Sequence, residues 1–265
     1  MSSDDENFDL AGVFTEPPRP PTPEPTVTTY TRNGSKVTSP DDWRSIDIRL
    51  VGSHPLWAHY LWNAALALAS FLDSNVDLFK GRCVLELGAG GALPSIVAAK
   101  LGARKVVVTD YPDASLVQNM SYNVSKNTTK EESSRVAVQG YIWGHAVKPL
   151  LDDLPSNVDP KLFDVIILSD LIFNHSQHDA MLKTCELALA PSTAGNAEVP
   201  QVLVFYSHHR PHLADRDMQF FVKAKEHGWV CDEIYTKTFP PMFPNDSGEE
   251  SIRSTVHGWR LTKLN

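Results

Sequence analysis

The sequence predicts an α/β fold in which helices cover both faces of a mostly parallel, seven-stranded sheet. Strand and helix patterns alternate along most of the chain, as they do in folds built from β-α-β units. The early strand segments are apolar along their whole length, which is typical of strands buried on both faces. Only a loop separates the last two strand segments, so we expect them to be antiparallel neighbours.

The predicted elements begin at residue 54. A helix is expected over residues 54–72, with Pro55 in its first turn and with Leu61, Ala65 and Leu68 on one face. Further helices are expected over residues 92–103, 113–126, 178–189 and 215–228. Strands are expected over residues 82–87, 105–110, 135–140, 164–170, 201–207, 229–237 and 254–263. This order indicates a Rossmann-like fold with an antiparallel last strand.

The N-terminal segment differs from the rest in composition. Residues 1–42 hold seven of the 19 prolines and eight acidic against three basic residues. The run EPPRPPTPEP cannot form a helix or an inner strand, because proline lacks the amide hydrogen that both need. We predict a disordered, Pro-rich acidic tail over residues 1–42 and a single domain over residues 43–265.

Composition narrows the classes of function. The net charge of −8 over 265 residues disfavours a nucleic-acid partner, since phosphate contacts need clustered Lys and Arg. The N-terminus lacks the apolar core of a signal peptide, and the longest apolar run, Ala64 to Ala69, is too short to span a bilayer. Three cysteines far apart in the sequence favour reduced, interior thiols. We expect a monomeric cytoplasmic protein without a membrane partner.

The stretch VLELGAGGALPS, residues 84–95, has the pattern of a strand, a glycine-rich turn and a helix N-terminus. Such a turn lets the backbone approach a ligand closely. A nucleoside triphosphate loop would need Gly-Lys-Ser/Thr after the turn, which is absent. A dinucleotide fold would place a third glycine three residues beyond Gly90, where the chain has Leu93. A strand-to-helix bend of purely structural purpose also remains open.

An acidic residue on the next strand favours a nucleoside ligand. Asp110 ends the segment VVVTD, 20 residues after Gly90, at the edge of the sheet where ligands bind in open α/β folds. A carboxylate there can accept hydrogen bonds from both hydroxyls of a ribose. The alternative role, capping the next helix, suits Asp113 better. A ribose acid without the pyrophosphate glycine fits a nucleoside that lacks a diphosphate, of which S-adenosylmethionine is the common example.

Further residues are predicted at the same edge of the sheet. Trp62 precedes the first strand and Trp143 follows the third, although a single tryptophan is as often a core residue. Ser169 and Asp170 end the fourth strand, with a helix cap as the alternative role for Asp170. His208, His209 and His212 could line a substrate mouth or belong to a plain loop. We expect no metal there, because no carboxylate or cysteine completes a ligand set nearby in the sequence.

Five motifs carry a resemblance to a known family over about residues 43–265. They are LWNAALALASFL, VLELGAGGALPSI, VVVTDYPD, the pair WG at 143–144, and ILSDLIF. With them the chain resembles the class I, seven-strand S-adenosylmethionine-dependent methyltransferases, and more narrowly the protein-lysine methyltransferases related to the methyltransferase-like 21 group. The tail, SHPLW and TDYPD are most similar to the fungal branch that methylates elongation factor 1-alpha at its N-terminus. That branch was formerly labelled nicotinamide N-methyltransferase.

The resemblance implies roles for individual residues. The residues implied to contact S-adenosylmethionine are Trp62, Gly88, Ala89, Gly90, Asp110, Trp143 and Ser169. Asp170 would hold the substrate amine, and Phe173 would form a wall of its channel with cation–π contact to methylated product. Where the group often has an acid, two residues and Tyr, this chain has Asp170-Leu171-Ile172-Phe173, so the tyrosine hydroxyl is missing.

The implied activity is N-methylation of elongation factor 1-alpha as a protein substrate, at its N-terminal α-amine with an adjacent lysine as a further target. Two alternatives stay open. One is a small-molecule N-methyltransferase of the nicotinamide type. The other is an inactive S-adenosylmethionine-binding partner protein, against which the presence of Asp110 and Asp170 speaks.

Overall fold

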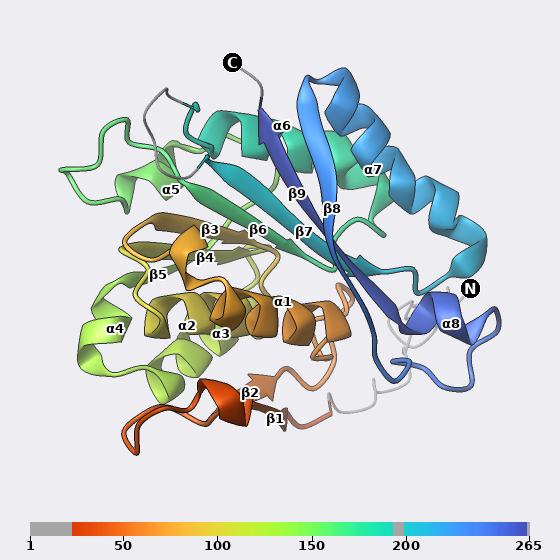
Figure 1. Ribbon diagram of the computed structural model, residues 1–265, viewed down its shortest axis with the longest axis horizontal. Coiled ribbons are helices and arrows are strands. Elements are labelled where there is room, and N and C mark those ends of the chain that lie inside the picture. Colours follow the sequence, from red (N-terminus) through yellow and green to blue (C-terminus); the bar gives the residue numbers. More distant parts are fainter. Residues whose placement is uncertain (1–22, 193–198, 264–265) are drawn as a thin grey trace, which may run out of the picture.

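The central feature of the computed structural model is a seven-stranded sheet with helices on both faces (Figure 1). The model describes residues 23–192 and 199–263. The strand order is β5-β4-β3-β6-β7-β9-β8. The strands are β3 (Cys83–Leu87), β4 (Lys105–Asp110), β5 (Val136–Gly140), β6 (Val165–Ser169), β7 (Gln201–Ser207), β8 (Trp229–Thr238) and β9 (Thr255–Lys263). The predicted α/β, Rossmann-like class is confirmed.

The strand directions also agree with the prediction. Strands β3 to β7 pair in parallel, and β9 pairs antiparallel with both β7 and β8. Val84 on β3 lies beside Val106 on one neighbour and Val165 on the other, so the first strand in the sheet is an inner one. The chain builds outward from β3 to β5 and then crosses back to β6. The order of strands therefore switches between β3 and β6.

Helices cover the two faces of the sheet as separate layers (Figure 1). One layer contains α1 (Asn63–Ser74), α2 (Leu93–Lys100) and α3 (Ala114–Asn127), and the other contains α5 (Lys148–Asp152), α6 (His178–Ala188) and α7 (Ala214–Glu226). Alternate residues of the inner strands supply the two cores: Val84 packs with the first layer, and Leu85 with the second. Three short helices were not predicted: α5, α4 (Lys130–Ser134) and α8 (Glu250–Ser254).

The helix predicted over residues 54–72 is wrong in its first half. Helix α1 begins only at Asn63, and residues 54–62 form turns. Trp57 has a φ of 62°, in the left-handed region that a bulky side chain rarely adopts. The apolar spacing of this segment is that of a helix, but its side chains line a cavity instead of packing on the sheet.

The N-terminal prediction also needs correction, because part of the expected tail is folded. Residues 1–22 lie outside the described residues, but β1 (Thr26–Thr31) pairs antiparallel with β2 (Ser45–Leu50). The β-branched run TVTTYT favours a strand, a signal that the neighbouring prolines obscured. The ordered part of the chain therefore starts before residue 43.

The β1–β2 hairpin is fixed to the helical layer by polar contacts. In Figure 1 it lies on the outer side of α3, where Asn123 bonds both the N–H and the C=O of Arg49, at 2.9 and 2.8 Å. Beside the hairpin, Arg32 donates two hydrogen bonds to Asp73 of α1, Nη2 to Oδ1 at 2.7 Å and Nε to Oδ2 at 3.0 Å. This ion pair is nearly buried, with side-chain exposures of 9% and 3%.

Two smaller features complete the fold. The three cysteines are free; Cys83 and Cys185 are buried, as predicted for interior thiols, whereas Cys231 is partly exposed. Within residues 23–192 and 199–263, no helix has the length and apolar character that a membrane crossing requires.

We predict that Arg32→Ala lowers the free energy of unfolding by about 3 kcal/mol, because it leaves the buried Asp73 carboxylate without its cation. Urea unfolding measures the loss. Arg44→Ala is the matched control, since Arg44 is exposed in the same part of the chain, and its effect should stay within about 0.5 kcal/mol. Equal effects of the two variants would show that the ion pair does not fix the N-terminal segment.

Candidate functional site

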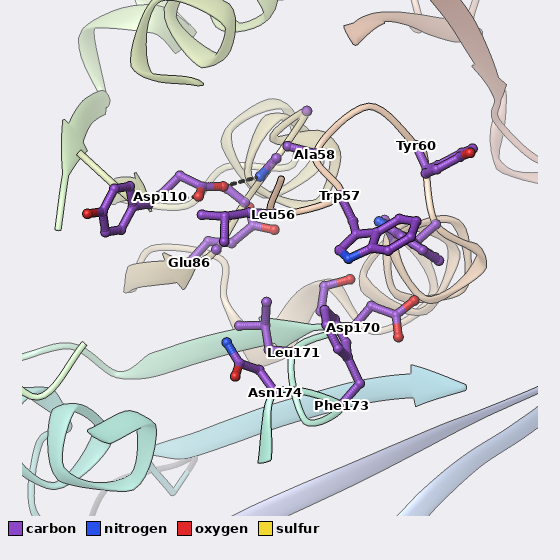
Figure 2. A pocket seen from close by; sticks show the side chains of 18 of the residues that line it. Leu56, Trp57, Ala58, Tyr60, Glu86, Asp110, Asp170, Leu171, Phe173 and Asn174 are labelled. Atoms are coloured by element: carbon purple, nitrogen blue, oxygen red, sulfur yellow. Dashed lines mark hydrogen bonds between the residues drawn. The ribbon is translucent and has the colours of Figure 1, made fainter. Parts of the chain in front are cut away.

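A cavity of about 530 Å³ opens at the carboxyl ends of β3, β4, β5 and β6 (Figure 2). It lies at the switch in strand order between β3 and β6, where ligands bind in open α/β folds. All the predicted site residues line it: Trp62, Gly88, Ala89, Gly90, Asp110, Trp143, Ser169, Asp170 and Phe173. The structure thus brings residues from positions 62 to 173 into one site.

The glycine-rich turn after β3 needs its glycines for two different reasons. Gly88 has a φ of 60°, and a Cβ there would lie 2.6 Å from Leu171 Cδ2 and 3.1 Å from Trp143 Cζ2. Gly90 has a φ of 52° but open space around it, so its backbone conformation is the reason for glycine. The turn therefore presents bare backbone to the cavity.

Asp110 is fixed by the turn that it faces. Its Oδ2 accepts a hydrogen bond from the Gly90 N–H and its Oδ1 accepts one from the Tyr111 N–H, both at 2.7 Å. Burial raises the pKa of this carboxyl, and the two backbone hydrogen bonds partly oppose that shift. A carboxylate has about four lone-pair sites, so two remain for a ligand. The helix-cap alternative falls to Asp113, which accepts from the Ser115 N–H as expected.

Glu86 is a buried cavity residue that the sequence analysis did not assign. It is 1% exposed, and its Oε2 accepts hydrogen bonds from the N–H and the hydroxyl of Ser95. Burial raises its pKa from 4.5 to about 8, against the effect of those hydrogen bonds. An acid in the otherwise apolar strand segment VLEL was the signal that could have identified it.

Two buried polar atoms in this cavity have no partner among the described residues. They are Glu86 Oε1 and Ser169 Oγ, and buried polar atoms of this kind are normally hydrogen-bonded. The acidic residues that line the cavity are Glu86, which keeps its proton to about pH 8, Asp110 and Asp170, and the described lining contains no Lys or Arg. This donor and charge set fits S-adenosylmethionine, whose sulfonium and ammonium groups are both cationic.

The cavity has two ends of different character. Asp110 lies at one side, and Trp57, Phe173 and Asp170 lie at the other (Figure 2). Tyr60 also lines this second end, and Phe173 is 41% exposed there. We call this end the aromatic end; its residues are Trp57, Tyr60, Trp62, Phe173 and Asp170. It suits a cationic or alkylated amine, since aromatic faces attract cations.

Asp170 is buried at the aromatic end and is already paired. It has a φ of 58°, its residue is 4% exposed, and both of its carboxylate oxygens lie 2.9 Å from Nε2 of His209. Its alternative role as a helix cap is wrong, because Gln177 occupies the N-cap position of α6.

None of the three predicted histidines, His208, His209 and His212, belongs to the described lining of the cavity. Two of them, His208 and His209, pair with acidic residues. His208 Nδ1 and His175 Nε2 each lie 2.7 Å from the carboxylate of Asp217 on α7, which is nine positions from His208 and 42 from His175 in the sequence. Within the described ranges, no group of three or more His, Cys, Asp or Glu side chains has a metal-holding arrangement.

Comparison with known proteins gives a consistent result. The family model described as lysine methyltransferase matches residues 46–227. The protein N-terminal and lysine N-methyltransferase of Eremothecium gossypii is 45% identical, over 99% of both chains. Its counterpart in Cryptococcus neoformans is 43% identical, over 100% of this chain and 91% of its own. A candidate RNA methyltransferase from Pyrococcus horikoshii has a TM-score of 0.51 and 20% identity, over 80% of this chain and 90% of its own, a likeness of fold alone.

We predict that Glu86 makes the ligand-free protein less stable as pH rises. The folded state keeps the Glu86 proton up to about pH 8, whereas the unfolded state loses it near pH 4.5. The folded state therefore binds more protons between these values, and the free energy of unfolding falls by up to about 1.4 kcal/mol per pH unit. Glu86→Gln should remove this loss, so that the free energy of unfolding of the variant rises relative to that of the wild type between about pH 5 and about pH 8.

Denaturant unfolding at both pH values tests this prediction. Glu131→Gln is the control, since the Glu131 side chain is 86% exposed. A constant difference in stability between Glu86→Gln and wild type at both pH values would contradict the assigned titration.

Proposed function

The chain belongs to the lysine methyltransferase family, and on that premise we propose that its substrate is the N-terminal α-amine of elongation factor 1-alpha, with a neighbouring lysine as a further target. The enzyme is an S-adenosylmethionine-dependent protein N-methyltransferase. The relatives from Eremothecium and Cryptococcus are named for methylation of both N-termini and lysines. The motifs TDYPD and SHPLW support the fungal elongation-factor branch.

One observation carries the proposal: a cavity lined by three acidic side chains, without Lys or Arg in its described lining, ends in a cluster of aromatic side chains. Such a cavity suits a cationic cofactor at one end and an amine at the other. The net charge of −8 would also steer a basic protein substrate toward the enzyme.

Different residues of the cavity have different roles in cofactor binding and methyl transfer. S-adenosylmethionine supplies, when bound, a methyl group on a sulfonium whose leaving group is a neutral thioether. We assign Asp110 to the ribose hydroxyls, and Glu86 and Ser169 to polar atoms of the same ligand. The glycine turn lets the backbone approach it. No acid is needed for the leaving group, so the protein has to position the amine in line and keep water out.

The amine must be unprotonated, because its lone pair forms the new bond to carbon. An α-amine has an ordinary pKa of about 8, whereas a lysine has one of about 10.4. The described lining of the cavity contains no histidine, lysine or cysteine that could act as a base. A site of this kind suits an α-amine, which gives up its proton to water near neutral pH.

The proposed substrate can be tested with labelled S-adenosylmethionine. We expect label on elongation factor 1-alpha that has a free N-terminal amine, and much less after the N-terminus has been acetylated. Nicotinamide is assayed in parallel. Label on nicotinamide alone would support the small-molecule alternative, and label that survives acetylation would move the target to an internal lysine. Cofactor binding without transfer to either substrate would support the inactive-partner alternative.

We predict that Asp110→Ala weakens S-adenosylmethionine binding by about 1.5–3 kcal/mol, the scale of hydrogen bonds to a charged group. Isothermal calorimetry measures the affinity. Asp113→Ala is the matched control, because Asp113 is a nearby acid whose hydrogen bonds go to Ser115 at the start of α3. Unchanged affinity in folded Asp110→Ala would remove the ribose assignment.

A further inference from the structure

The Asp170–His209 pair is the most constrained ionisable contact at the aromatic end. The side chains are 3% and 15% exposed, and His209 Nε2 lies 2.9 Å from both oxygens of Asp170. Asp170 lies in the turn after β6, and its backbone N–H donates a hydrogen bond to the C=O of Phe205 on β7 at 2.7 Å. His209 follows β7 and its ring lies 4.7 Å from that of Trp62. Both partners are thus fixed from neighbouring strands.

The surroundings of His209 favour its charged form. The acidic groups that act on it are Asp170 and, at longer range, Asp217. Asp217 already pairs with His175 and His208, so Asp170 is the direct counter-ion. Burial lowers the pKa of His209, but the two carboxylates outweigh burial and the net shift is upward. The uncharged ring of Trp62, which lines the cavity, packs against His209, and Asp170 itself faces the cavity.

The pair matters because a carboxylate that orients a substrate amine also favours the protonated form of that amine. A carboxylate can orient an amine by accepting its hydrogen bonds, but a lone carboxylate also raises the pKa of a nearby amine, typically by about 1 to 3 units. The protonated amine has no lone pair and cannot react. An uncompensated Asp170 would therefore bind the amine in its unreactive form.

We propose that His209 is a positioning residue for methyl transfer, whose positive charge neutralises Asp170 and so lets that carboxylate orient the substrate amine without favouring its protonated form. The inference rests on the proposed function, in that the substrate is an amine. One His209 N–H serves both oxygens, which leaves lone pairs on Asp170 for the amine. The amine proton goes to water before transfer. The nitrogen lone pair then forms the N–C bond while the C–S bond breaks and its electrons stay on sulfur.

The pH dependence of kcat, measured with both substrates saturating, separates this role from a merely structural one, because kcat reports the protonation of groups in the bound complex. Wild-type enzyme and His209→Asn are assayed from about pH 6 to about pH 10 with labelled S-adenosylmethionine and a substrate peptide whose only free amine is at its N-terminus. For His209→Asn we expect the acid limb to move upward by about 1 to 3 pH units. The rate near pH 7 should fall tenfold or more, and the rate at high pH should recover.

Two further variants make the test specific. His209→Lys keeps a cation beside Asp170 and should keep the wild-type acid limb. His208→Asn is the matched control, because it breaks a buried histidine–carboxylate pair with Asp217 and does not contact Asp170; its acid limb should not move. His209→Gln replaces His209→Asn if the latter does not fold, with thermal melting as the check.

The outcomes are distinct from failure of the proposed function. If the wild-type enzyme transfers no label to the peptide, the proposed substrate is wrong. If wild-type transfer is active but His209→Asn loses the same factor at every pH, His209 has only a structural role. Loss of the acid limb in His209→Asn without rescue by His209→Lys would make His209 a base and would overturn the inference.

Discussion

Burying a carboxylate costs free energy unless the group is protonated, paired or hydrogen-bonded, and three such groups line the cavity of this methyltransferase. Each is compensated in a different way. Asp110 accepts two backbone N–H groups, Glu86 keeps its proton to about pH 8, and Asp170 pairs with His209. The backbone of the glycine turn, the start of α2 and the end of β7 are thereby all fixed around one cavity.

This compensation explains why the cavity can attract cations without being unstable on its own. A carboxyl group that already has one hydrogen-bond or ion-pair partner still has free lone pairs, so all three groups can accept hydrogen bonds from a ligand. The sheet makes the arrangement possible, because parallel strands bring their carboxyl ends to one edge. Residues that are far apart in sequence, such as Glu86 and Asp170, therefore share one site.

The sequence was sufficient where the signal was local. The glycine turn, the acid at the end of the second sheet strand and the alternation of strands and helices predicted the sheet and its ligand-binding edge. The family resemblance implied the nine site residues, and all of them line one cavity. The sequence was insufficient where tertiary contacts override local pattern. Residues 54–62 have helical apolar spacing but line the cavity, and β1 gains its stability from β2 and from Asp73. The pairing of Asp170 with His209 joins residues 39 positions apart, so no local motif could show it.

The two ends of the cavity put opposite demands on charge. In the proposed assignment the end at Asp110 gains from negative charge, because the sulfonium of S-adenosylmethionine carries a positive charge that no proton transfer can remove. The aromatic end must accept an amine that has lost its proton, and there a free negative charge would favour the wrong form. At the aromatic end a buried histidine lies beside the carboxylate. At the other end the acidic side chains are hydrogen-bonded or, in the case of Glu86, protonated. The two ends therefore meet their different requirements in different ways. On this view the placement of His209 favours substrates whose amines deprotonate readily, and an α-amine satisfies that requirement better than a lysine does.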